Sequence, residues 1–192
     1  MEADWVKDAQ GLERWLEGLL THSVATLELP ILLRLCQSIA EEDQLSTVRW
    51  CNYLLASRET LEMRREERQR GSALTKLLPN LDIIIPANLA DSVQSTQLAG
   101  IALAANQWNI APLDTCKGYA WSWLENTTMA GVKLIPLGQT QGQQILLRIA
   151  GKIPAAITLA AELADGDIGS STPAQAIASS KHETQYTRLF RS

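Results

Sequence analysis

The chain has 192 residues, of which 46% are apolar and 20% charged, a composition typical of one globular domain that folds without metal ions or disulfide bonds. Seventeen Lys and Arg residues against 21 Asp and Glu residues give a net charge of -4, so no large positive field favours nucleic acid or anionic lipid. The three cysteines lie far apart in the sequence, so we expect no disulfide bonds and a cytoplasmic location. The uninterrupted apolar stretches are far shorter than the roughly 20 residues that cross a membrane. We therefore expect neither an export signal nor a membrane span.

Apolar residues at helical spacing predict three helices in the first part of the chain. Asp8 is the expected N-cap of the first helix, which buries Leu12, Trp15, Leu16, Leu19 and Leu20. Glu28 and Pro30 suit the first turn of a second helix. Ser46 is the expected cap of a third, longer helix that ends near Gly71. A short further helix is predicted over residues 72–78.

The second half of the chain also favours helices. Residues 79–88 contain two prolines and the run Ile83-Ile84-Ile85, which we interpret as a buried loop because a lone strand has no partner. The predicted helices that follow are one capped by Asp91 and reaching Trp108, a central one from Asp114 to Leu134, and one over residues 140–163 with a kink at Pro154. The sequence therefore predicts an all-α fold.

Composition changes at Asp165, where small and polar residues interrupt the helical pattern. We expect a single compact helical domain over residues 1–164 and a flexible C-terminal tail over residues 165–192, with a short helix over residues 174–180. Arg188, Leu189, Phe190 and Arg191 place an apolar pair between two arginines near the end of the chain. A frayed terminus is one interpretation, and a segment that orders on binding a partner is the one we favour.

No motif for catalysis or cofactor binding is present in the sequence. It lacks a phosphate-binding Gly-x-x-x-x-Gly-Lys-Ser/Thr loop and a Gly-x-Ser-x-Gly nucleophile motif. Its two histidines, His22 and His182, are not at metal-ligand spacing with any other ligand. We therefore expect no enzyme activity, no resident cofactor and no metal site within one chain.

Three polar or aromatic features have two interpretations each. Residues 58–70 contain five arginines and four glutamates, which form either a solvated helix end or a site of polar recognition. Trp121 and Trp123 flank Ser122 and belong either to a helix packed on several sides or to a dimer or partner surface. Lys133 either reaches solvent over a buried stem or pairs across an interface.

Several stretches resemble the urease accessory protein family UreF. They are Leu54-Leu55-Ala56-Ser57-Arg58-Glu59-Thr60 with residues 64–71, Gly118-Tyr119-Ala120-Trp121-Ser122-Trp123 with Met129-Ala130-Gly131-Val132-Lys133-Leu134, and the tail from Asp165 through His182-Glu183-Thr184-Gln185-Tyr186 to Arg188-Leu189-Phe190-Arg191-Ser192. The resemblance covers essentially the whole chain, and the tail is its most specific part.

The resemblance implies an all-helical, non-catalytic chaperone that forms a homodimer. It implies binding to UreD, also called UreH, and recruitment of the GTPase UreG for nickel insertion into the urease apoprotein. It assigns partner binding to Tyr186, Arg188, Leu189 and Phe190 in the tail, to Lys133, and to Arg58 and Glu59. The alternative is a GTPase-activating protein that inserts an arginine into the nucleotide site of UreG.

The chain departs from the family pattern at its beginning. Family members usually have a further N-terminal segment that contains a Pro-x-Gly-x-Tyr/Phe-Ser/Thr-x-Ser-x-Gly-Leu-Glu motif, and this sequence starts after it. We expect the neighbouring helices to expose apolar surface as a result, with weaker stability or altered dimerisation than in a longer form.

Overall fold

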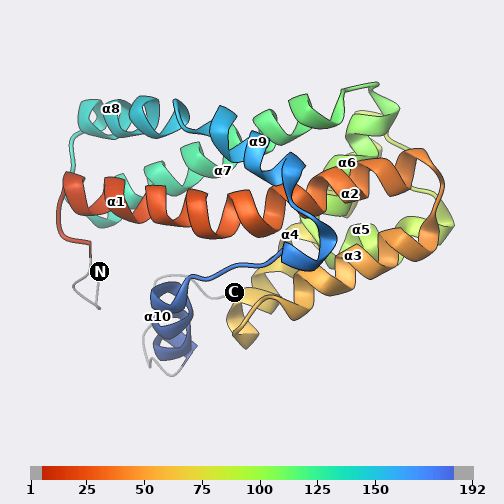
Figure 1. Ribbon diagram of the computed structural model, residues 1–192, viewed down its shortest axis with the longest axis horizontal. Helices are drawn as coiled ribbons and strands as arrows, with labels where there is room; N and C mark the ends of the chain where they lie inside the picture. Colours follow the sequence, from red (N-terminus) through yellow and green to blue (C-terminus); the bar gives the residue numbers. More distant parts are fainter. Residues whose placement is uncertain (1–5, 184–192) are drawn as a thin grey trace. The chain divides into compact units, whose positions relative to one another are not determined.

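The computed structural model describes residues 6–183, and every regular element in this part of the chain is a helix (Figure 1). The predicted all-α class is confirmed. The α-helices are α1 (Ala9–Leu19), α2 (Leu29–Ala40), α3 (Gln44–Ala56), α4 (Leu61–Leu77), α5 (Ala90–Ser95), α6 (Gln97–Gln107), α7 (Pro112–Leu134), α8 (Gln139–Ala150), α9 (Ile153–Glu162) and α10 (Pro173–Glu183). A π-helical stretch, η1 (Leu20–Glu28), joins α1 to α2, and short 3-10 turns form η2 (Leu78–Leu81), η3 (Ala87–Leu89) and η4 (Asp165–Asp167).

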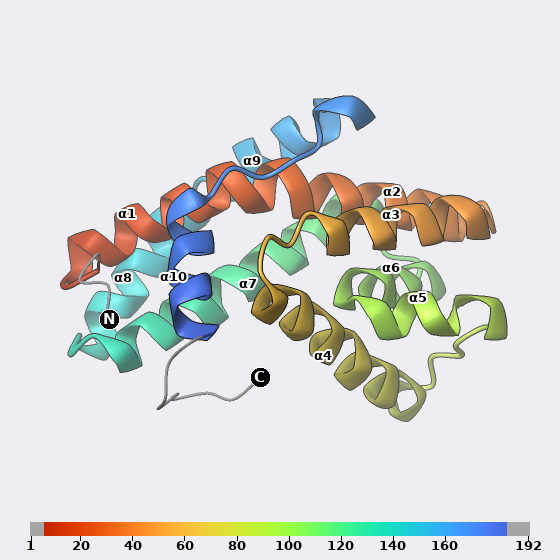
Figure 2. The ribbon, with the colours of Figure 1, turned by 90° about the horizontal axis from the view of Figure 1, so that it is seen from below.

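Contacts among the helices divide the described chain into two compact units. In the first, residues 6–29 and 116–172, α8 lies beside α1 and α9 lies against η1 (Figure 1). In the second, residues 30–115 and 173–183, α4 packs against α5 and α6, and α10 lies against α4 (Figure 2). Residues 165–172 group with the first unit. The predicted boundary between a domain of residues 1–164 and a tail stays a prediction.

The first two predicted helices form one continuous helical stretch, so the break expected before Pro30 is wrong. Residues 20–28 contain neither Gly nor Pro, and Val24 and Leu27 are fully buried, so the helix continues as η1. Proline has no amide hydrogen, which leaves the Thr26 carbonyl without its usual i+4 donor. The Gly169 amide donates to that carbonyl at 2.9 Å instead. The proline is thus accommodated inside the helix.

The segment after η4 is anchored along η1. Besides the bond from Gly169, the Ser171 amide donates to the carbonyl of His22 at 3.0 Å, and Ile168 is 2% exposed. These contacts hold residues 168–171 in place immediately before α10.

The third predicted helix is interrupted at residues 57–60 and forms α3 and α4. Thr60 has an extended backbone, and its hydroxyl accepts from the Met63 amide at 3.2 Å, so it is the N-cap of α4. Gly71, the expected end of this helix, lies inside α4, which continues to Leu77. Its backbone passes very close to the α5–α6 junction, because a Cβ at Gly71 would lie 2.5 Å from the Gln94 carbonyl oxygen. Close backbone packing therefore explains this glycine better than a helix end.

The helix expected from Asp91 to Trp108 is also divided. Thr96 is extended, with φ -151° and ψ 142°, and its hydroxyl accepts from the Leu98 amide at 3.2 Å, so Thr96 rather than Asp91 caps the longer helix α6. In the loop before α5, Ile83 is buried as expected, but Ile84 is 75% exposed. The side-chain amide of Gln107 fixes Ile84 by bonding both its amide and its carbonyl, at 3.0 and 2.6 Å.

The predicted central helix is confirmed as α7, while the last long helix is split at Gly151 and Lys152. Pro154 lies in the first turn of α9, where a proline is tolerated, so it begins a helix instead of kinking one. By length and composition alone, Ala9–Ala40 and Gln139–Glu162 could each cross a membrane. The apolar window of the first is 72% buried within the protein, as in the core helix of a soluble protein.

Candidate partner-binding surfaces

Arg58, Glu67 and Thr96 form a buried polar network in the second unit. The Nε and Nη2 atoms of Arg58 donate to Oε2 of Glu67 at 3.2 and 2.7 Å. The Thr96 hydroxyl donates to the other carboxylate oxygen at 2.6 Å. The two charged side chains are 11% and 4% exposed. One carboxylate therefore ties the α3–α4 connection to α4 and to the cap of α6.

Two residues predicted to bind a partner, Arg58 and Glu59, have different surroundings. Arg58 lies inside the network, and its carbonyl accepts from Nη1 of Arg64 at 2.6 Å. Glu59, its neighbour, is exposed. Only Glu59 is placed for direct contact with another protein. Their partner-binding roles stay predictions.

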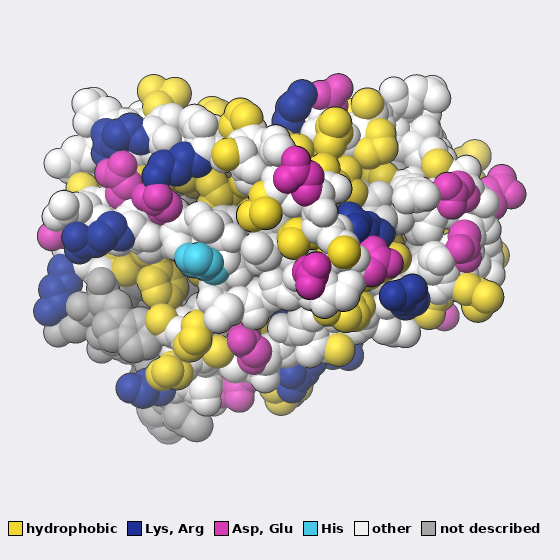
Figure 3. Space-filling view, viewed as in Figure 1, with side chains coloured by type: hydrophobic (Ala, Val, Ile, Leu, Met, Phe, Trp, Pro, Cys, Tyr) yellow, Lys and Arg dark blue, Asp and Glu magenta, His cyan; other side chains and the backbone are white. Residues whose placement is uncertain are grey.

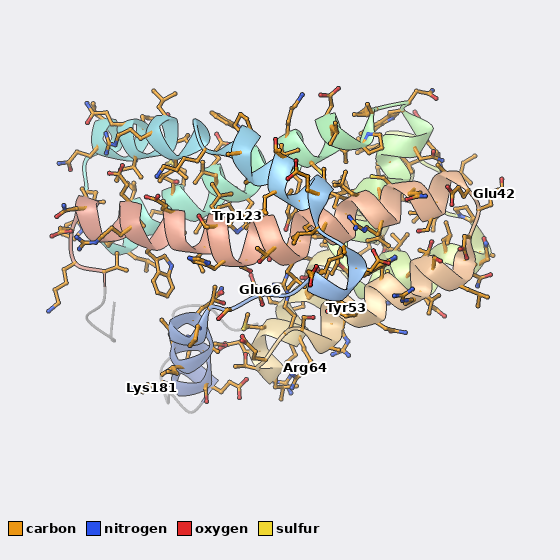
Figure 4. All side chains as sticks on the ribbon, in the orientation of Figure 1. Glu42, Tyr53, Arg64, Glu66, Trp123 and Lys181 are labelled. Carbon is orange, nitrogen blue, oxygen red and sulfur yellow. The ribbon has the colours of Figure 1, made fainter. Side chains whose placement is uncertain are left out.

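Helix α10 is fixed to the beginning of α4 by polar side chains. The hydroxyls of Thr60 and Ser179 share a hydrogen bond of 2.7 Å, and the Glu62 amide donates to the Glu183 carboxylate at 2.8 Å. The Nδ1 atom of His182 lies 2.7 and 2.9 Å from the two carboxylate oxygens of Glu62. Figure 4 labels Arg64 at this end of α4 and Lys181 on α10.

The tail residues predicted to bind a partner, Tyr186, Arg188, Leu189 and Phe190, lie outside the described residues. The last described residue is Glu183, whose carboxylate occupies the first turn of α4, where free amides and the helix dipole favour an anion. The contacts that fix α10 to α4 therefore end at Glu183, three residues before Tyr186 in the sequence.

One side of α7 is exposed and carries a glycine, a tryptophan and a lysine. Trp121 is 42% exposed, whereas Trp123, two positions further along the helix, is half-buried. Gly118 is exposed, and no atom of the described chain lies within 4 Å of a Cβ built there. Lys133 is exposed in the last turn, beside Leu134, which is 41% exposed.

The opposite side of α7 is buried in the first unit. Leu124 and Ala120 have no exposed surface, and the Tyr119 hydroxyl donates to the buried Glu28 carboxylate in η1 at 2.9 Å. This hydrogen bond holds α7 against the π-helical stretch. It also leaves the side that carries Gly118 and Trp121 facing outward.

The three cysteines, Cys36, Cys51 and Cys116, are buried and form no disulfide. Burial raises the pKa of Cys36 to about 11, and burial also raises the pKa of Cys51 to about 11. Both thiols therefore stay protonated at neutral pH, whereas a metal ligand must be a thiolate. Within residues 6–183, no group of three or more His, Cys, Asp or Glu side chains is arranged to hold a metal ion.

Charged side chains of both signs are interspersed on the face shown in Figure 3, with apolar side chains between them. This face therefore offers no continuous positive stripe of the kind that binds a phosphate backbone.

Comparison with known proteins identifies the family. The UreF family model matches residues 6–150. A urease accessory protein UreF of Alcanivorax borkumensis is 48% identical over 198 residues, covering 100% of this chain and 86% of that relative. The UreF proteins of Klebsiella pneumoniae subsp. pneumoniae and Pseudomonas putida W619 are each 44% identical, with the same coverage of both chains. The predicted resemblance is confirmed, and the chain belongs to the UreF family of urease accessory proteins.

Proposed function

We propose that this chain is an adaptor in urease maturation and catalyses no reaction of its own. Together with UreD it recruits the GTPase UreG, so that nickel is inserted into the urease apoprotein in the cytoplasm. The observation that carries this proposal is similarity over the whole chain to proteins named urease accessory protein UreF. The exposed side of α7 also supports it, since buried contacts on the opposite side of this helix hold it in place.

The direct test is assembly on a sizing column. The chain, UreD and UreG are expected to elute as one complex larger than any pair. Separate elution of all three proteins, with or without GTP, would contradict the proposal.

The tail is the proposed UreD-binding element, through Tyr186, Arg188, Leu189 and Phe190. The contacts of α10 with α4 support this role, because anchoring the preceding helix reduces the entropy that the tail loses on binding. Deletion of Leu189–Ser192 is expected to abolish co-elution with UreD and to leave helix content unchanged. Far-UV circular dichroism measures the helix content of the same samples.

The control for this deletion is Ile177→Ser, which removes a 49% exposed apolar side chain from α10 and leaves the tail intact. This variant is expected to keep UreD binding. The tail assignment is wrong if the deleted chain still co-elutes with UreD.

Lys133 and Glu59 are proposed contacts for partner proteins, with Lys133 facing UreG. Both side chains are exposed, and Leu134 adds apolar surface beside Lys133. An exposed cation next to an exposed apolar side chain is typical of an interface rim. Arg58 contributes by holding the loop that carries Glu59.

The exposed side of α7 is the proposed homodimer surface. A glycine in the middle of a helix costs about 0.5–1 kcal/mol relative to alanine, and no contact within the described chain accounts for Gly118. Its missing side chain allows another helix to approach closely, and the neighbouring Trp121 provides a large aromatic anchor.

Trp121→Glu is therefore expected to weaken dimerisation at least tenfold, because truncating a central aromatic anchor commonly costs about 2 kcal/mol or more. Sedimentation equilibrium measures the dimer dissociation constant. Trp108→Glu is the matched control, since Trp108 is 51% exposed but lies on the α6–α7 connection. Equal dissociation constants for the two variants would reject α7 as the dimer surface.

A further inference from the structure

The five arginines of residues 58–70 separate into two groups by their contacts. Arg58 and Arg64 are engaged around the buried network, and Arg70 forms an ion pair with Glu66. Arg65 and Arg68 are exposed and form no hydrogen bond or ion pair with another residue among 6–183. The internal hydrogen bonds and ion pairs of the described residues therefore do not explain why arginine occupies these two positions.

Arg65 and Arg68 belong to a basic face of α4, defined here as Arg65, Arg68 and Lys76, which helical periodicity places on one side of the helix. All three residues are exposed, whereas another side of the helix buries Glu67 and Gly71. Glu66 is the one exposed carboxylate between Arg65 and Lys76, so positive charge predominates. At 1.5 Å per residue the face is about 16 Å long.

The basic face is presented by a rigid helix. Thr60 caps its beginning, Glu67 bonds Arg58 and Thr96 beneath it, and Gly71 lies in backbone contact with the α5–α6 junction. Fixing the helix axis in this way places Arg65 and Arg68 on one side of the helix before any partner arrives. Such preorganisation lowers the entropy cost of recognition.

We propose that the basic face of α4 binds a carboxylate-rich segment of a partner protein. The whole chain carries a net charge of -4, so an exposed face of opposite sign attracts acidic surfaces that the rest of the protein repels. Arginine forks pair with carboxylates through two parallel hydrogen bonds, which gives direction as well as charge.

A nucleic acid is the weaker candidate for this face. Glu66 lies beside this face, and Glu59 and Glu62 lie at the beginning of the same helix region. These carboxylates would repel a continuous phosphate backbone, whereas a peptide can place its acids opposite the arginines alone.

The test uses three fluorescein-labelled probes of ten units each: deca-glutamate, deca-glutamine and single-stranded dT10. Binding to the full chain is measured by fluorescence anisotropy in 20 mM salt, taken as roughly the low-salt regime in which screening is weak. The variants are R65E, R68E, the double variant R65E/R68E, and R14E as the control. Arg14 is an exposed arginine in α1 that forms no hydrogen bond or ion pair with another residue among 6–183, and its reversal changes the net charge by the same amount as each single variant.

We expect deca-glutamate to bind the unmodified chain, with at least a threefold loss in each single variant and at least a tenfold loss in R65E/R68E. R14E is expected to change the affinity less than twofold, and deca-glutamine is expected not to bind. Circular dichroism should give the same helix content for all variants. The proposal is overturned by absence of deca-glutamate binding, by an equal loss in R14E, or by dT10 binding as tightly with the same dependence on Arg65 and Arg68.

Discussion

Replacing Glu67 by alanine is expected to lower the free energy of unfolding by about 3–5 kcal/mol, the usual effect of removing one partner from a buried ion pair. Arg58 is only 11% exposed and loses the carboxylate that neutralises it. The Thr96 hydroxyl, 2.6 Å from that carboxylate, loses its acceptor as well. Urea unfolding followed by circular dichroism at 222 nm measures the change.

The neighbouring Glu66 is the matched control for this prediction. It also pairs with an arginine, Arg70, but the two side chains are 51% and 49% exposed. An exposed pair of this kind contributes about 0–1 kcal/mol, so Glu66→Ala should be nearly neutral. Glu67→Gln should lie between the two, because an amide keeps an acceptor for Thr96 but carries no charge. Similar losses for Glu66→Ala and Glu67→Ala would show that burial of the network does not matter.

The sequence predicts the helices well wherever apolar spacing alone decides them. Leu12, Leu16, Leu19 and Leu20 have the spacing of a buried helical side, and all four are buried. The central helix is found for the same reason. These helices can be predicted because their buried sides appear in the sequence as apolar residues at helical spacing.

The interruptions of the helices are harder to predict because distant residues fix them. Thr60 has the sequence signature of an N-cap, but the apolar residues on either side continue the helical pattern across it. Thr96 becomes a cap while its hydroxyl donates to Glu67, 29 positions earlier in the chain. Neither the burial of Glu67 nor its bond to Thr96 follows from local sequence.

The candidate surfaces were only partly predictable. The charged segment at residues 58–70 has two interpretations in the sequence, and the resemblance to UreF assigns Arg58 to a partner, while the structure places its side chain in an internal network. The structure instead leaves Arg65 and Arg68 exposed. Only the contact distances separate the engaged arginines from the exposed ones, because five similar side chains in one segment of 13 residues give no sequence signal for that division.

Gly71→Ala is expected to lower the free energy of unfolding by about 2 kcal/mol, as overpacking of a tight contact usually does. The added Cβ would lie 2.5 Å from the Gln94 carbonyl oxygen and 2.7 Å from the Thr96 amide nitrogen. Both atoms belong to the backbone, so they cannot turn aside as a side chain can. For a chain of this length, the loss corresponds to a decrease of about 4–8 °C in the melting temperature, which calorimetry measures.

Alanine variants at two other glycines distinguish the cost of a steric clash from the general effect on stability of replacing glycine in a helix. At Gly100 the new Cβ meets the end of the Leu74 side chain at 2.6 Å, which can rotate, so Gly100→Ala should cost less than Gly71→Ala. At Gly18 no atom lies within 4 Å, so Gly18→Ala should raise stability by about 0.5–1 kcal/mol through helix propensity. If the three variants instead had equal melting temperatures, the close approach of α4 to the α5–α6 junction would be wrong. The rigid support inferred for the basic face of α4 would then lose one of its contacts.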